Sequence, residues 1–135
     1  MTQLTTLGRQ RGASMSVLVC LLVPTLLLCI GLAVDGAAKA AADRQAEAVA
    51  AQAARTGVDA AAPALLTGGN AQAAALAAAD RVIAAHPEVT GRVELDSGDS
   101  LVVTTTISTP TIFLGLAGIH ELSGHGQARV DLRPG

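Results

Sequence analysis

Residues 13–34 read ASMSVLVCLLVPTLLLCIGLAV, a run of 22 residues without a formal charge. As an α-helix with a rise of about 1.5 Å per residue, this run reaches roughly 33 Å, enough to cross a hydrocarbon core of about 30 Å. Pro24 and Gly31 do not oppose a span, because both residue types are common in transmembrane helices. The run therefore predicts one membrane-spanning helix near the start of the chain.

A cleavable signal peptide is the alternative, since it also has a basic start followed by an apolar stretch. The apolar region of a signal peptide is about 7 to 15 residues long and ends at an A-x-A-like site. The first good match here, Ala38-Lys39-Ala40, lies beyond the end of the run. The length favours a retained anchor, and cleavage near Ala40, which would release a secreted soluble binding module, stays the alternative.

The charges that flank the run predict its orientation. Arg9 and Arg11 precede it, no acidic residue occurs before Asp35, and the charges that follow are of mixed sign. The positive-inside rule then places the N-terminus in the cytoplasm. We expect a single-pass protein of the plasma membrane with a cytoplasmic leader (1–12), a transmembrane helix (13–34) and an exterior domain (35–135).

Two helices are expected in the first part of the exterior domain. The alanine-rich stretch Gly36 to Arg55 has high helix propensity, so it should extend the membrane helix until Thr56-Gly57 ends it. A charged stripe recurs every fourth residue of that stretch, beginning with an Asp35–Lys39 pair. Asn70 is a good N-cap for a second helix, which Pro87 stops.

The remainder alternates like a small sheet. Residues 90–95 and 100–108 predict a β-hairpin, and residues 121–132 predict a third strand. The fold class is therefore α+β, with two helices and an antiparallel sheet of about three strands. Phe113 is the only aromatic residue, so the core should be thin and built from Val, Leu and Ile.

Between the second and third strands lies TIFLGLAGI (Thr111–Ile119), an apolar stretch too short to span a membrane. It is a candidate contact patch that could dock on a partner protein or on the bilayer, and it is equally consistent with a buried connector that caps the sheet. The residues of this possible patch are Ile112, Phe113, Leu114 and Leu116.

No catalytic motif is present in the sequence. The segment HELSGH fails the H-E-x-x-H pattern, because His120 and His125 are five residues apart instead of four. A metal site that adds His86 to these two is a minor alternative. With a net charge of -2 and dispersed arginines, a nucleic-acid site is not expected. We expect no enzymatic activity, no cofactor and no small-molecule substrate.

Arg11-Gly12 stands directly before the apolar run, and a basic residue followed by glycine is also how type IV pilin-like leader peptides end. Gly12 and Ala13 therefore form a possible leader-peptide junction. The other interpretation is a membrane-interface anchor with a helix-starting glycine.

The whole layout resembles the TadE/TadG-like proteins of Flp (tight adherence) pilus assembly, in their short actinobacterial form. The resemblance rests on Gly31 to Gly36, Arg44 to Ala54 and Thr109 to Val130. It implies a non-enzymatic, membrane-anchored envelope component of that pilus system or of a related secretion apparatus. The implied partners are the lipid bilayer and other pilus-assembly membrane proteins. Val17 stands where processed pseudopilins carry glutamate, so both an unprocessed anchor and a processed minor pseudopilin stay open.

Overall fold

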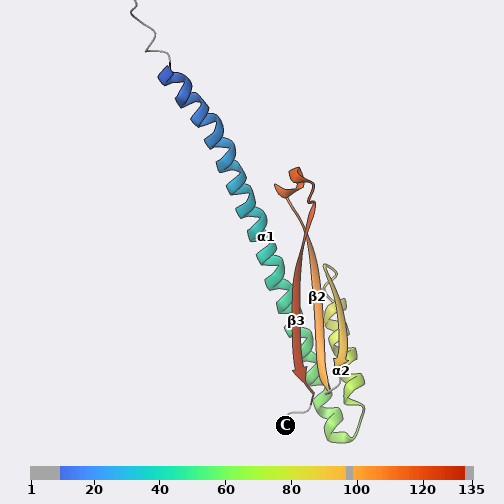
Figure 1. Cartoon of the computed structure of the whole chain (residues 1–135). Helices are drawn as coiled ribbons and strands as arrows, with labels where there is room; N and C mark the ends of the chain where they lie inside the picture. Colours follow the sequence, from blue (N-terminus) through green and yellow to red (C-terminus); the bar gives the residue numbers. More distant parts are fainter. Residues whose placement is uncertain (1–9, 97–98, 133–135) are drawn as a thin grey trace, which may run out of the picture.

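The computed structural model describes residues 10–96 and 99–132 and has the expected α+β architecture (Figure 1). One long helix, a shorter helix and a three-stranded antiparallel sheet follow one another along the chain. The elements in order are α1 (Gln10–Thr67), α2 (Ala71–Ala84), β1 (Val89–Asp96), β2 (Ser100–Pro110), the 3-10 helix η1 (Leu114–Ala117) and β3 (Glu121–Asp131).

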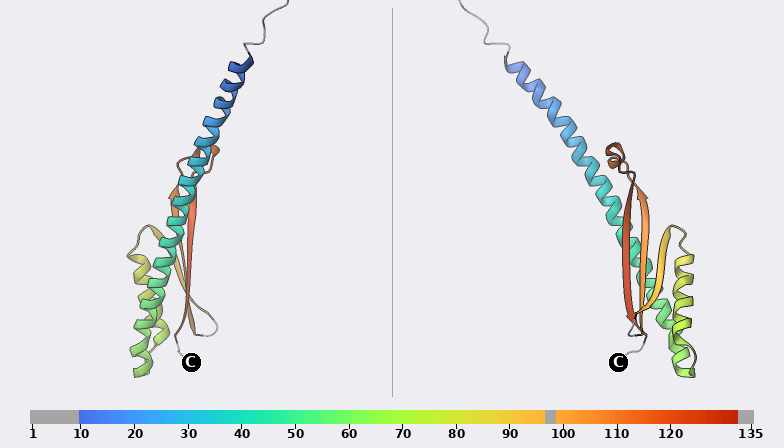
Figure 2. Two further views of the ribbon diagram at one scale, coloured as in Figure 1. Left: turned by 90° about the vertical axis from the view of Figure 1, so that its left-hand side faces the viewer. Right: turned by 45° about the vertical axis from the view of Figure 1, so that its right-hand side comes forward.

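Helix α1 is continuous over 58 residues, so the apolar segment (residues 13–34) and the alanine-rich stretch form one rod. Its N-terminal half projects away from the sheet, while its C-terminal half lies along it (Figures 1 and 2). The prediction that Thr56-Gly57 ends this helix was wrong. A Cβ on Gly57 would lie 2.5 Å from the Leu101 side chain, so the glycine admits a core residue instead of breaking the helix. The helix ends at Thr67, before Gly68 at φ 73°.

The second helix matches its prediction closely. The Asn70 side chain accepts a hydrogen bond of 2.9 Å from the backbone N–H of Ala73, as an N-cap does. Helix α2 then packs beside the C-terminal half of α1 and against β1 (Figure 2). The core between them is largely alanine, with Leu101 and Val103 as its largest fully buried aliphatic side chains.

The sheet has the order β1-β2-β3, and all neighbouring strands are antiparallel. Small residues on β3 let the backbone of α1 approach the sheet closely. A Cβ on Gly126 would lie 2.3 Å from the Ala46 carbonyl carbon, and one on Gly124 would lie 2.5 Å from that of Ala42. At the same crossing the buried Thr105 hydroxyl donates to the Ala46 carbonyl oxygen over 2.8 Å.

Strands β2 and β3 are longer than β1, and this difference builds an arm. The β1–β2 pairing begins at Val89 opposite Ile107, whereas the β2–β3 pairing continues to Pro110 opposite Glu121. Strands β2 and β3 therefore extend past the end of β1, and this two-stranded extension is the arm. It follows α1 toward its projecting half (Figure 1). The loop at the end of the arm, Thr111–Ile119, is called the hairpin tip below.

Candidate membrane-facing site

The apolar segment offers an almost uninterrupted apolar surface. Every residue from Met15 to Val34 is exposed except Gly31, and α1 is long and apolar enough there to cross a membrane. The one hydroxyl at its centre is satisfied internally, because Thr25 donates to the Leu21 carbonyl oxygen over 2.7 Å. The free thiols of Cys20 and Cys29 both lie on this exposed surface.

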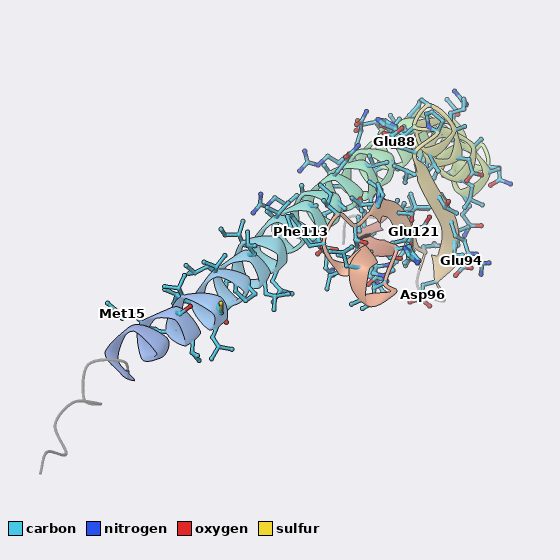
Figure 3. All side chains as sticks on the ribbon, turned by 90° about the horizontal axis from the view of Figure 1, so that it is seen from above. Met15, Glu88, Glu94, Asp96, Phe113 and Glu121 are labelled. Atoms are coloured by element: carbon cyan, nitrogen blue, oxygen red, sulfur yellow. The ribbon has the colours of Figure 1, made fainter. Side chains whose placement is uncertain are left out.

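Gly31 is buried because the hairpin tip lies on it. A Cβ at this position would come within 2.6 Å of the Phe113 ring, so only glycine leaves room for the aromatic side chain. Figure 3, which views the molecule from above, shows Phe113 next to the helix. The tip therefore contacts the last turns of the apolar segment itself.

Asp35, the first residue after that segment, holds the tip in place. Its carboxylate accepts hydrogen bonds from the backbone N–H groups of Ile112 (2.9 Å), Phe113 (3.0 Å) and Leu114 (2.6 Å). The residue retains only 1% of its accessible surface. Three successive amides on one carboxylate form an anion-binding nest whose anion belongs to the same chain. We call this arrangement the Asp35 clasp.

The clasp favours the ionised carboxylate. The N–H of Ile112 has the largest effect on the pKa of Asp35 and lowers it, and the amides of Leu114 and Phe113 act in the same direction. Burial opposes them, but the pKa still falls below its ordinary value of 3.8. Asp35 is therefore an anion at neutral pH.

The tip presents apolar side chains outward and is no buried connector. Leu116 is 90% exposed and Ile112 is 69% exposed, while Phe113 and Ile119 are partly covered. The alternative of a buried connector that caps the sheet does not agree with these exposures, because the tip sits beyond the end of β1, where no third strand lies beside it. The alternative of an exposed contact patch agrees with these exposures.

Between the tip and α1 runs an apolar groove of about 340 Å³. Helix α1 contributes Leu28 and Leu32 to it, and the tip contributes the rest. The tip residues that line it are Phe113, Leu114, Leu116 and Ala117.

A second polar contact ties β3 to α1 two turns further along. Asp43 accepts a hydrogen bond of 3.0 Å from the backbone N–H of His125 on β3, and it forms an ion pair of 2.8 Å with Lys39. The Lys39 hydrogen bond, followed by that from His125, lowers the pKa of Asp43. The predicted Asp35–Lys39 pair was wrong, since Asp35 turns toward the tip and Lys39 pairs with Asp43 instead.

The other candidate positions lie apart from this site. Gly12 and Ala13 are in the first turns of α1, well before Gly31, and most of the leader falls outside the described residues. The three histidines do not gather, because no group of three His, Cys, Asp or Glu in the described part of the chain could hold a metal ion. The Thr106 hydroxyl lies 3.3 Å from Nδ1 of His125, within hydrogen-bond distance on the sheet's exposed face.

Sequence reasoning missed Asp35 and Gly31 as members of the site. Asp35 is the first charged residue after the apolar segment, which marks it as unusual, but its partners lie 77 to 79 positions later in the chain. Gly31 looked like an ordinary membrane-helix glycine. A single sequence gives no signal that links either residue to the tip.

Comparisons with protein-family models, with curated proteins and with solved structures find no match for this chain.

Proposed function

We propose that this protein is a non-enzymatic, single-pass membrane protein of the cell envelope that serves as a component of Flp/Tad-type pilus assembly or of a related secretion apparatus. In this proposal the N-terminus lies in the cytoplasm and the α+β domain lies outside. Its partners are the lipid bilayer and other membrane proteins of the same apparatus.

The observation that carries the anchoring part is the division of α1 into two halves with opposite surroundings. From Met15 to Val34 the side chains are exposed and, apart from Ser16 and Thr25, apolar, and the tip lies on Gly31. From Ala42 onward one face of the same helix is buried against α2 and the sheet. An apolar surface of this length needs lipid or other protein around it, because water would oppose its exposure.

The Asp35 clasp also favours retention over cleavage near Ala40. Such a cut would remove the carboxylate that accepts three amides of the tip, together with the Lys39 partner of Asp43. The released domain would then carry three amides without their partner. The pilus assignment itself rests on the TadE/TadG-like sequence features, to which the structure adds a helix continuous from the apolar segment to the domain.

A processed minor pseudopilin is the second candidate, and the unbroken helix favours it. A subunit that leaves the membrane must bury its apolar half against neighbouring copies, and a straight projecting helix allows this packing. The mature N-terminus separates the two candidates: a start at Ala13 would indicate the pseudopilin, whereas a start at residue 1 or 2 would indicate the unprocessed anchor.

Deletion and complementation in the native host would test the function. We expect deletion to reduce the number of surface pili seen by electron microscopy, or the amount of substrate secreted. The full chain should restore the phenotype, whereas residues 36–135 exported behind a cleavable signal peptide should not. Normal piliation and secretion after deletion would refute the assembly role, and rescue by the exported domain would refute the need for an anchor.

A further inference from the structure

We propose that the hairpin tip is a second membrane contact, which inserts beside the transmembrane helix into the leaflet nearer the α+β domain. This inference rests on the membrane anchoring proposed above and adds a site to it. The occupant of the tip's exposed apolar surface is then the bilayer itself, at the boundary between headgroups and acyl chains.

The level of the tip along α1 is the first argument. Phe113 lies on Gly31, and the groove beside it reaches Leu28. Leu28 precedes Val34 by six residues, about 9 Å along a helix axis. When the apolar segment crosses the bilayer, the tip is therefore carried to roughly the depth at which interfacial apolar groups insert, about 5 to 10 Å.

The surface chemistry of the tip is the second argument. Its nine residues carry no formal charge, and its most exposed large apolar side chains are Ile112 and Leu116. The groove continues this surface onto Leu28 and Leu32 of the helix, so lipid chains around α1 would also meet the tip. An apolar surface that continues a membrane-spanning surface should be covered by the same lipid.

Charged groups begin directly beyond the tip. Glu121 starts β3, two residues after the tip, and accepts a hydrogen bond of 2.9 Å from the Ser108 hydroxyl. On α1 the half-exposed Lys39 comes one turn after Asp35. On both the helix and the arm, charged side chains therefore follow the apolar ones within a few residues.

The third argument is that most backbone N–H groups of the tip have an acceptor within the protein. A loop that enters a bilayer must satisfy its N–H groups within the protein, since no water is available there. Asp35 accepts three of these groups, and carbonyl oxygens of the tip and of His120 accept most of the others. The N–H groups with a protein acceptor are those of Thr111, Ile112, Phe113, Leu114, Leu116, Gly118 and Ile119.

Tryptophan quenching by brominated lipids tests the insertion directly. The chain has no Trp and no Tyr, so one introduced tryptophan is the only such reporter. The test variant is Leu116→Trp, at a position 90% exposed, and the matched control is Leu66→Trp, at a position 89% exposed near the far end of α1. Leu22→Trp, in the apolar segment, reports whether the anchor itself is inserted.

The full chain of each variant is reconstituted into phosphatidylcholine–phosphatidylglycerol vesicles with lipids brominated at shallow or deep acyl positions. We expect shallow bromines to quench the Leu116→Trp variant at least twofold and deep bromines to quench the Leu22→Trp variant, with Leu66→Trp unaffected. A quenched reporter at position 22 with an unquenched one at position 116 would overturn the insertion while the anchor stands, whether water or a second protein covers the tip. An unquenched reporter at position 22 would overturn the anchor, and the insertion with it.

Discussion

Asp35 is a single residue that holds a distant loop, since its carboxylate accepts hydrogen bonds from three consecutive amides of the hairpin tip. A neutral side chain of the same shape cannot replace it. An Asn in this place has one acceptor oxygen and one NH₂ group, and the NH₂ group would face an amide N–H. Position 35 therefore requires both the shape and the charge of aspartate.

Asp35→Asn should loosen the tip while the sheet remains folded. We expect amide hydrogen exchange in residues 111–119 to accelerate by roughly tenfold or more, about the factor that loss of one charge-assisted hydrogen bond represents. Exchange mass spectrometry on the full chain in detergent micelles would measure it. Glu47→Gln, at an exposed position on the same helix, is the control. Equal exchange of the tip in both variants would contradict the clasp.

The clasp should also respond to acid in a defined direction. The pKa of Asp35 is lowered in the folded protein, so its contribution to stability is fully present above the ordinary value of 3.8. It is lost as the pH falls through the lower, folded-state pKa. In micelles the fluorescence of Leu116→Trp should change in that acid range, and the same reporter combined with Asp35→Asn should lack this change. Identical titrations of the two proteins would exclude Asp35 as the cause.

Between elements, the close approach of α1 to the sheet depends on residues without bulk. Alanines on the helix meet Gly124 and Gly126 on β3, and backbone atoms fill the space that a side chain would need. This packing also explains how a core with few large side chains holds together. Alanine buries little area, but its small side chain lets the helix and the sheet approach closely. This approach brings Thr105 within hydrogen-bond distance of the helix backbone.

Gly126→Ala should destabilise the domain by about 1 to 3 kcal/mol, because the new methyl group must push α1 away from β3. Thermal unfolding of the full chain in detergent, followed by circular dichroism, would measure the loss. Gly36→Ala is the control, since a Cβ there has no atom within 4 Å and helix propensity favours alanine. Equal melting temperatures for the two variants would show that the helix approaches less closely than described.

Thr105→Val tests the hydrogen bond at the same crossing. We expect a loss of about 1 kcal/mol, since valine keeps the shape but removes the donor to the Ala46 carbonyl oxygen. Thr104→Val, on the exposed face of β2, should leave the stability nearly unchanged. Urea titrations of both proteins in micelles would compare them, and a larger loss at position 104 would refute this assignment.

The elements themselves were largely predictable from the sequence, whereas the contacts between them were not. Local signals such as the Asn70 cap, Pro87 and the alternation in the strands predicted the second helix and the sheet. Gly57 led to a wrong helix end, because a glycine that makes room for the Leu101 side chain looks the same in sequence as one that ends a helix. The tip was recognised as apolar, but its attachment to Asp35 joins positions nearly eighty residues apart, which no local pattern encodes.

At the scale of the whole molecule, one continuous helix joins the exposed apolar segment to the α+β domain. Helix α1 carries the apolar segment in its N-terminal half and packs along the sheet in its C-terminal half, so the domain cannot tilt far from the apolar segment without bending the helix (Figure 1). The clasp and the Asp43–His125 contact add two further ties along the same line. The proposed orientation then fixes which side of the membrane the domain occupies.

Thiol labelling should establish that orientation. Cys20 and Cys29 lie in the apolar segment, so we expect neither to react with a membrane-impermeant maleimide in intact cells. An added cysteine, Leu66→Cys, should react there without permeabilisation, because position 66 is 89% exposed near the end of α1 that lies against the domain. Reaction only after permeabilisation would invert the topology, and reaction of the unaltered chain would argue against membrane insertion of the segment.

The hairpin tip, placed beside Gly31 and fastened to Asp35, has a consequence for how such molecules meet one another. A domain held to the proposed membrane by one helix can lean toward or away from the bilayer as that helix tilts. A second membrane contact beside the helix would restrain this tilt, while rotation about the membrane normal and translation in the plane would both stay free. The polar face of the β-sheet would then keep a constant angle to the membrane, so two copies would present that face to each other at the same height.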